Sequence, residues 1–174
     1  MESFDVDEIL NTMVILVDSR EQDTARARER YSRFGAPYRR AHLSYGDYCC
    51  NYQRAGAWRY DEEETVHPDV VIERKMNLDE LAMCFSRERK RFTAEFERIK
   101  AAGAKPYLLI ENATWENLLA GKYKSKFNPK AFKASLSAWM ARYNCTVITC
   151  KSETSGELIK EILYRELKER LQNE

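Results

Sequence analysis

The run TMVILVD, Thr12 to Asp18, is the feature that most constrains the fold. It is rich in β-branched and aliphatic residues and lacks polar alternation, so it predicts a strand that is covered on both faces. Further apolar runs at Val70–Lys75, Lys105–Asn112 and Cys145–Cys150 predict three more strands. The strands alternate with helical segments, which predicts an α/β fold with a mixed central sheet flanked by helices.

The segments between these runs supply helices and shorter strands. Helical periodicity and capping residues predict helices over Asp23–Phe34, Asn77–Phe85, Ser86–Ala102, Thr114–Gly121, Asn128–Tyr143 and Gly156–Leu171. Shorter strands are predicted over Tyr38–Leu43, Asp47–Gln53 and Ala57–Tyr60. The acidic stretch DEEETVHPD that follows is expected to be an exposed turn.

The length of 174 residues fits one domain, taken here as residues 1–174. No segment approaches the roughly 20 apolar residues that span a bilayer, and the start MESFDVDEIL is acidic where a signal peptide would be basic. We therefore expect an intracellular protein without a membrane partner. The five cysteines form no CxxC pair and are interpreted as reduced thiols. Because the net charge is only +1, nucleic-acid binding would have to come from local clusters.

Three charges interrupt the strand VVIERK. Residues two apart on a strand share a face, so Glu73 and Lys75 point one way and Arg74 points the other. Asp18 and Asp47 stand at the ends of other strands, so acids converge where several strands terminate. Carboxylates are ligands for hard divalent cations, and a lysine beside such an ion could orient or deprotonate a water molecule. The alternative is a strand end that simply emerges into solvent.

Three separated motifs carry a family resemblance: VDSRE at Val17–Glu21, GDY at Gly46–Tyr48, and IERK followed by Asp79. They resemble the nuclease domain of XPF-type structure-specific endonucleases, whose signature is GD, a variable gap, ERK, three residues and D. The resemblance implies a restriction-endonuclease-like core and a metal-dependent DNA endonuclease for branched or flapped DNA in repair or recombination. It implies catalytic-site positions at Asp18, Arg20, Glu21, Asp47, Glu73, Arg74, Lys75 and Asp79. Within that set, it implies that Asp18, Asp47 and Glu73 bind Mg²⁺ or Mn²⁺ and that Lys75 is the catalytic lysine.

Several of these residues have structural alternatives. Asp79 lies in the first turn of a helix, where any acid interacts favourably with the helix dipole. Arg74 could serve only as an internal salt-bridge partner, for instance to an acid of the neighbouring loop. Asp18 and Glu21 could be ordinary turn residues. For the whole protein, the alternative is a noncatalytic DNA-binding or partner subunit, since the family includes degenerate members that only bind.

Basic residues cluster in two places. The segment GKYKSKFNPKAFK contains no acid, and its lysines suggest contacts to DNA phosphates, with a solvated loop as the alternative. The candidate DNA-binding residues here are Lys122, Lys124, Lys126 and Lys130. Arg87 and Arg91 are expected, with Arg98, on one side of the helix Ser86–Ala102, where they would form a second basic face.

The long gap between Asp47 and Glu73 suggests an added hairpin or loop over residues 51–68, near the site. The sequence ends soon after the nuclease-like region, so the expected form lacks the helix-hairpin-helix and helicase-like regions of large relatives. A DNA-binding partner protein could compensate. Relatives dimerise through this domain, and the amphipathic helices Asn128–Tyr143 and Gly156–Leu171 could form a homodimer surface or be internal core. A stand-alone domain would suit a microbial or viral enzyme of the cytoplasm or nucleoid.

Overall fold

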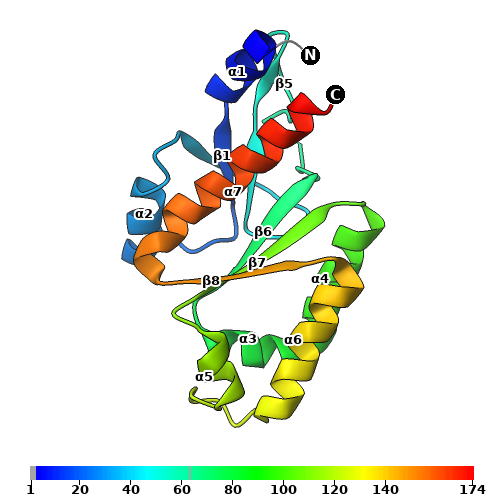
Figure 1. Cartoon of the computed structure of the whole chain (residues 1–174). Coiled ribbons are helices and arrows are strands. Elements are labelled where there is room, and N and C mark those ends of the chain that lie inside the picture. The colour runs from blue at the N-terminus through cyan, green and yellow to red at the C-terminus, as the bar shows by residue number, and fades with distance from the viewer. Residues whose placement is uncertain (1–2, 63) are drawn as a thin grey trace.

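A computed structural model describes residues 3–62 and 64–174. It contains a six-stranded sheet of order β2-β1-β3-β6-β7-β8 (Figure 1). The strands are β1 (Val14–Asp18), β2 (Tyr38–Ala41), β3 (Tyr48–Asn51), β6 (Val70–Lys75), β7 (Lys105–Glu111) and β8 (Thr146–Cys150). Strand β3 is antiparallel to both of its neighbours, and the other pairs are parallel. The predicted α/β class with a mixed sheet is confirmed.

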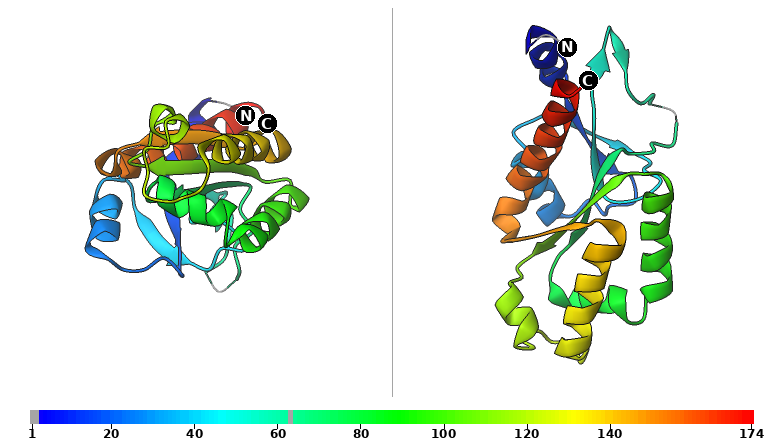
Figure 2. Two further views of the ribbon diagram at one scale, coloured as in Figure 1. Left: turned by 90° about the horizontal axis from the view of Figure 1, so that it is seen from below. Right: turned by 45° about the vertical axis from the view of Figure 1, so that its right-hand side comes forward.

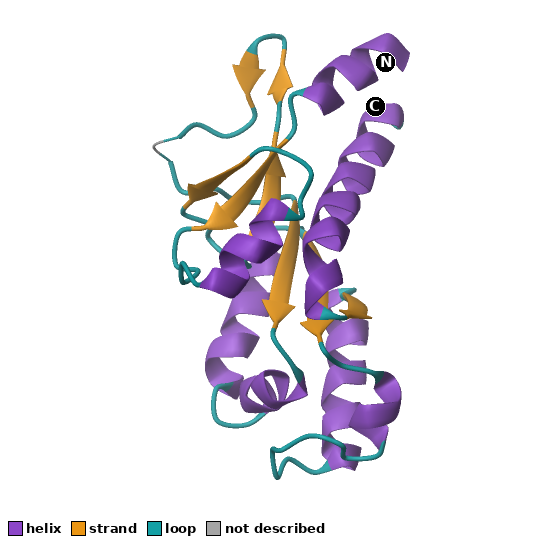
Figure 3. Ribbon diagram, turned by 90° about the vertical axis from the view of Figure 1, so that its left-hand side faces the viewer, coloured by secondary structure: helices purple, strands orange, loops and turns teal. Residues whose placement is uncertain are grey.

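Helices cover both faces of this sheet, as Figures 1 and 3 show. They are α1 (Ser3–Asn11), α2 (Ala25–Ser32), α3 (Leu78–Phe85), α4 (Arg89–Ala101), α5 (Trp115–Leu119), α6 (Pro129–Tyr143) and α7 (Ser152–Gln172). Helices α2 and α7 pack on one face, and α3, α4 and α6 pack on the other. None of the helices in the described residues is long and apolar enough to cross a membrane.

Side-chain alternation divides the sheet residues between these two layers. Ile15, Tyr48 and Ile72 contact α2 and α7, on what we call the α7 face. Val71 packs under α3, α4 and α6, on what we call the α4 face. Because the period of a strand is two, Glu73 and Lys75 also belong to the α4 face, whereas Arg74 belongs to the α7 face.

The segment after β3 covers the part of the α4 face that the helices leave open. Its β4 (Gln53–Arg54) and β5 (Ala57–Trp58) form a separate hairpin, which lies near α1 and the end of α7 (Figure 2). The chain then returns, and Val66 pairs with Leu43. Leu16 and Cys49 are buried beneath Leu43 and Val66 in a small cluster of their own.

Several element boundaries differ from the sequence prediction. Helix α1 was not predicted; its residues Val6, Ile9 and Leu10 are buried against the end of α7. Thr24, not Asp23, caps α2, and its side chain accepts a hydrogen bond from the Ala27 amide. Helix α7 begins at Ser152 and continues through Gly156.

Gly156 is tolerated inside α7 because the helix passes very close to α2. A Cβ atom at this position would lie 2.3 Å from the carbonyl oxygen of Arg30. The glycine that predicted a helix start therefore marks a helix contact. The apolar residues of α6 and α7, including Trp139 and Leu163, are buried inside the molecule, so these stripes are core and do not form a free dimer surface.

Candidate active site

The turn before β3 is built around Gly46. Its φ is +71°, and a Cβ atom there would lie 2.1 Å from Cγ2 of Val71, so both the backbone conformation and the packing require glycine. The next residue, Asp47, donates its amide to the carbonyl of Ile72 and accepts the Asp18 amide on its own carbonyl. The Gly-Asp pair therefore joins the end of β1 to the middle of β6.

Asp47 is fixed by the strand that carries the other candidate residues. Its Oδ2 atom accepts a hydrogen bond of 2.7 Å from the Arg74 amide. One residue before, Glu73 points to the α4 face, where its Oε1 atom lies 2.5 Å from Nζ of Lys75. The lysine ammonium also lies 5.2 Å from the ring centroid of Phe92. Asp47, from the turn before β3, and Glu73, from β6, thus lie close to the same lysine.

The electrostatics of this group reflect buried negative charge. Burial raises the pKa of Asp47 to about 6, although Lys75 and the Arg74 amide oppose the rise. Burial and the neighbouring Asp47 carboxylate raise the pKa of Glu73 well above its usual range. Burial alone would lower the pKa of Lys75, but Glu73 and Asp47 outweigh it and raise this pKa. Lys75 is therefore a stable ammonium in this arrangement.

Asp18 is close to this group but is engaged elsewhere. Its Oδ2 atom accepts a 2.7 Å hydrogen bond from Nε of Arg20, and its Oδ1 atom accepts one from the Leu43 amide. Arg20 in turn donates to the Leu43 carbonyl. Within residues 3–62 and 64–174, no three Asp, Glu, His or Cys side chains are gathered as a ready-made metal site. Of the predicted residues, Asp18, Asp47, Glu73 and Lys75 lie near one another, and each of these acids is already bonded to a donor of the protein.

Arg74 lies on the opposite face, in a buried network of charges. It forms ion pairs of 3.1 Å with both Glu21 and Glu111. Arg30 of α2 pairs with the same two acids, at 3.5 Å with Glu21 and 3.1 Å with Glu111. Tyr48 adds a hydrogen bond to Glu21. Arg74 and Glu21 therefore brace the strands behind the site, which agrees with the salt-bridge alternative for Arg74.

Glu95 is a site neighbour that the sequence did not predict. It lies on α4, and its Oε1 atom accepts a 2.9 Å hydrogen bond from the Gly46 amide. Its charge also contributes to the raised pKa of Glu73. In the sequence it falls between Phe92 and Phe96, whose side chains are buried in the core. An acid on the same helical stripe as two core aromatics was the available signal.

Asp79 and the predicted basic residues lie outside this group. The Asp79 carboxylate accepts a hydrogen bond from the Ser125 amide, and Lys122, Lys124, Lys126 and Lys130 are exposed. Arg87 precedes α4 in a turn, so the predicted helical face shared by Arg87 and Arg91 is wrong. Arg91 is exposed on α4 and pairs with Glu88.

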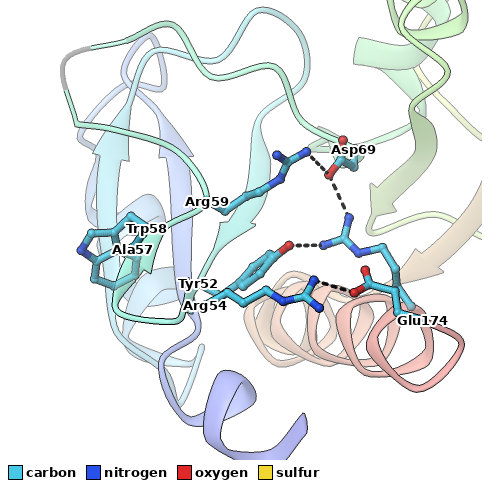
Figure 4. Close-up of a pocket in the computed structure, with 8 residues that line it drawn as sticks. Tyr52, Arg54, Ala57, Trp58, Arg59, Asp69 and Glu174 are labelled. Carbon is cyan, nitrogen blue, oxygen red and sulfur yellow. Dashed lines mark hydrogen bonds and ion pairs between the residues drawn. The ribbon is translucent and has the colours of Figure 1, made fainter. Parts of the chain in front are cut away.

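A groove lies between the β4–β5 hairpin and the end of α7 (Figure 4). It measures about 680 Å³. Arg59 and Arg170 share Asp69 across it, and Arg54 pairs with Glu174. These ion pairs fasten the 51–68 segment to α7. The candidate acids do not line this groove, so we treat it as separate from the site.

Comparisons with known proteins give the family. The sequence model of the ERCC4 domain matches residues 17–162. The structure resembles XPF from Aeropyrum pernix, with a TM-score of 0.60 and 16% identity over 88% of this chain and 61% of that chain. It also resembles XPF from Aeropyrum pernix in complex with DNA, with a TM-score of 0.59 and 17% identity over 90% of this chain and 66% of that chain.

These likenesses show a shared fold, and they confirm the restriction-endonuclease-like core that the resemblance implied. This chain spans somewhat less than two thirds of the length of either XPF chain. No curated protein matches the sequence. The family match covers most of the chain and includes all three motifs. The chain therefore belongs to the ERCC4 domain family of XPF-type nuclease domains.

Proposed function

We propose that this protein is a metal-dependent DNA endonuclease that hydrolyses phosphodiester bonds in branched or flapped DNA, in repair or recombination. One observation carries the proposal: Asp47 and Glu73 meet Lys75 on the α4 face, with Asp18 bonded to the same turn. The likeness to an XPF structure in complex with DNA supports DNA as the substrate.

The donor set fits a hard divalent cation. It offers carboxylate oxygens, which Mg²⁺ and Mn²⁺ prefer, and Asp47 and Glu73 repel each other in a buried place. The ion would be held by Asp18, Asp47 and Glu73. Asp18 would first have to release its hydrogen bond from Arg20. When bound, such an ion activates water and neutralises charge that develops on a phosphodiester.

The chain's own residues have distinct tasks in this proposal. Lys75 donates hydrogen bonds and a positive charge to the scissile phosphate and so stabilises the negative charge of the transition state. Arg20 is half-exposed beside Asp18 and can bind a phosphate oxygen. Glu21 and Arg74 keep β1 and β6 in place from behind. Arg91 and the exposed lysines would contact the DNA backbone.

A homodimer is also proposed, and it would use exposed residues of the C-terminal half. Strand β8 is an edge strand of the sheet, and Met140 of α6 is 37% exposed. Sedimentation of the protein and of a Met140→Glu variant tests this contact. A monomeric wild-type protein at micromolar concentration would contradict it.

A noncatalytic DNA-binding or partner subunit is the second candidate. The observation that favours it is that Asp18 and Glu73 are each already paired with a basic residue. The two candidates differ in one result, because the second predicts that Glu73→Ala leaves any observed cleavage unchanged.

The decisive experiment is a cleavage panel of labelled flaps, forks, four-way junctions, duplexes and single strands with Mg²⁺ or Mn²⁺. We expect cleavage of branched substrates by the wild-type protein and no product with chelator. Glu73→Ala is expected to abolish it. Intact DNA in every reaction, at protein concentrations that saturate binding, would contradict the enzymatic proposal.

A further inference from the structure

Asp79, the last acid of the ERK motif, bonds to a distant segment of the chain. Its Oδ1 atom accepts a 2.6 Å hydrogen bond from the amide of Ser125. Asp79 stands in the first turn of α3, which begins just after the strand that carries Glu73 and Lys75. In the described part of the chain, Ser125 is the only hydrogen-bond partner of this carboxylate. The motif residue is thus a link between β6 and residues 121–128.

The segment 121–128, which we call the lysine segment, is well anchored on its inner side. Tyr123 donates its hydroxyl to the Phe127 carbonyl at 2.6 Å, and the Phe127 amide donates to Oγ of Ser125. The rings of Tyr123 and Phe127 lie 5.4 and 5.5 Å from the ring of Phe132. These contacts give the segment a fixed path, at the opposite end of the molecule from the termini (Figure 1).

The outer side of the lysine segment carries unbalanced positive charge. Exposure alternates along it: Lys122, Lys124 and Lys126 are exposed, while the residues between them are half-buried. None of these lysines forms an ion pair with any described residue. The one carboxylate bonded to the segment, Asp79, contacts its backbone and leaves the three ammonium groups free. A row of free ammonium groups fits a polyanion such as the DNA backbone.

We infer that Asp79 is a positioning residue for DNA binding: by holding Ser125 it fixes the lysine segment relative to the strand of Glu73 and Lys75. This inference rests on the proposed function. Asp79 is six positions after Glu73 in the sequence, so their Cα atoms lie within roughly 20 Å, or about six base pairs of duplex. One DNA backbone can therefore reach both the lysine segment and the candidate site.

The inference separates Asp79 from the chemistry of the site. Asp79→Ala removes the acceptor for the Ser125 amide, so the lysines are no longer held in place. They must then become ordered when DNA binds, which lowers the affinity. Asp79→Asn keeps a side-chain oxygen that can accept the same hydrogen bond. An acid that acted on the metal or on the reacting phosphate would lose its role in both variants.

The experiment measures the affinity for a labelled forked duplex in chelator, over a range of salt concentrations, together with single-turnover cleavage at saturating DNA. For Asp79→Ala we expect affinity to fall by about tenfold and the slope of log K against log salt to become shallower by up to about 3, one for each lost phosphate contact. Any loss of cleavage in Asp79→Ala is expected to be recovered in Asp79→Asn, which keeps the hydrogen-bond acceptor. Asp79→Asn is expected to bind like wild type.

Two controls sharpen this test. Glu80 lies in the same helical turn as Asp79, and its carboxylate accepts a hydrogen bond from the Met76 amide. The Glu80→Ala variant is expected to leave the slope of log K against log salt unchanged. In a variant that carries Lys122→Gln, Lys124→Gln and Lys126→Gln, adding Asp79→Ala is expected to have no further effect on affinity. Additive losses would overturn the inference, because the acid and the lysines would then act independently.

A readout that does not need DNA completes the design. Hydrogen exchange of the Ser125 amide is expected to accelerate in Asp79→Ala and to stay slow in Glu80→Ala. Unchanged exchange, or equal loss of turnover in both Asp79 variants with unchanged affinity, would overturn the inference. A wild-type protein that fails to bind any DNA overturns the proposed function itself, whereas wild-type binding with an unaffected Asp79→Ala variant overturns this inference alone.

Discussion

Lys75 and Glu73, two residues apart on β6, form a 2.5 Å ion pair in which both side chains are at least 90% buried. The pair lies on the α4 face. Asp47 is close enough that its charge, like that of Glu73, raises the pKa of Lys75. A buried pair loses much hydration, and removal of one partner leaves the other charge unpaired. Loss of one partner alone should therefore lower stability as well as the proposed activity, and the two effects can be measured separately.

Lys75→Met is expected to slow cleavage by at least about 10²-fold, because the ammonium that stabilises the transition state is lost. It also leaves Glu73 unpaired, which costs about 3 to 5 kcal/mol of the free energy of unfolding. The double variant Glu73→Gln/Lys75→Met is expected to regain stability but not activity. Single-turnover cleavage and urea unfolding measure the two effects. A fully active Lys75→Met variant would remove this residue from the mechanism.

Arg74→Met is expected to destabilise the fold by about 3 to 5 kcal/mol, because it leaves Glu21 and Glu111 short of a partner in a buried network. The matched control is Arg165→Met, which breaks an exposed pair with Glu161 and should change the free energy of unfolding much less. Urea unfolding at neutral pH compares them. Equal losses in the two variants would mean that the network contributes no more than a surface pair.

Glu21 makes stability depend on pH in a predictable direction. Burial would raise its pKa, but the Tyr48 hydroxyl, Arg74 and Arg30 outweigh this and hold the pKa below its ordinary value of 4.5. The stabilisation is therefore complete above about pH 4.5 and is lost as pH falls through the folded pKa. The stability difference between wild type and Glu21→Gln should shrink from pH 6 to pH 3. A constant difference in urea unfolding over this range would contradict the assignment.

Gly46→Ala is expected to unfold the turn before β3 and to lower both stability and cleavage, since the new Cβ would overlap Val71. Gly35→Ala is the matched control: its φ is also positive, +60°, but nothing lies within 4 Å of the new atom. The control should lose only the roughly 1 to 2 kcal/mol of backbone strain. The difference in thermal stability between the two variants measures the cost of the contact between the new Cβ and Val71. Similar losses would show that Val71 moves aside without penalty.

Glu95→Ala is expected to slow cleavage by about tenfold or more, because the Gly46 amide loses its acceptor and Asp47 loses part of its support. Glu95→Gln retains an acceptor and is expected to restore most of the rate. Single-turnover cleavage at saturating DNA measures both. If the glutamine variant is as slow as the alanine variant, the negative charge of Glu95, and not its hydrogen bond, is what the site requires.

The sequence predicted the features that depend on the spacing of neighbouring residues. The apolar runs predicted β1, β6, β7 and β8, and strand alternation separated Glu73 and Lys75 from Arg74. An internal salt bridge from Arg74 to a loop acid was one of the two alternatives that the sequence left open, and Arg74 pairs with Glu21. These features follow from periods of two and 3.6 residues, which a sequence displays directly.

Contacts between distant segments were not accessible in the same way. Glu95 joins the site only because α4 packs beside the Gly46 turn, and Glu111 joins Arg30 only because α2 and β7 meet on the α7 face. Helix α1 is short, and its apolar residues Val6, Ile9 and Leu10 are buried against the end of α7. The packing of Val66 against Leu16 and Cys49 likewise depends on tertiary contacts.

The two faces of β6 differ in the substitutions that they can tolerate. Glu73 and Lys75 compensate each other, so one uncharged pair could replace both while the core remained intact. Arg74 has less freedom, because it pairs with two acids, Glu21 after β1 and Glu111 of β7, that are buried with it. If the protein is the proposed nuclease, a relative that lost catalysis would be expected to lose Glu73 and Lys75 and to retain Arg74.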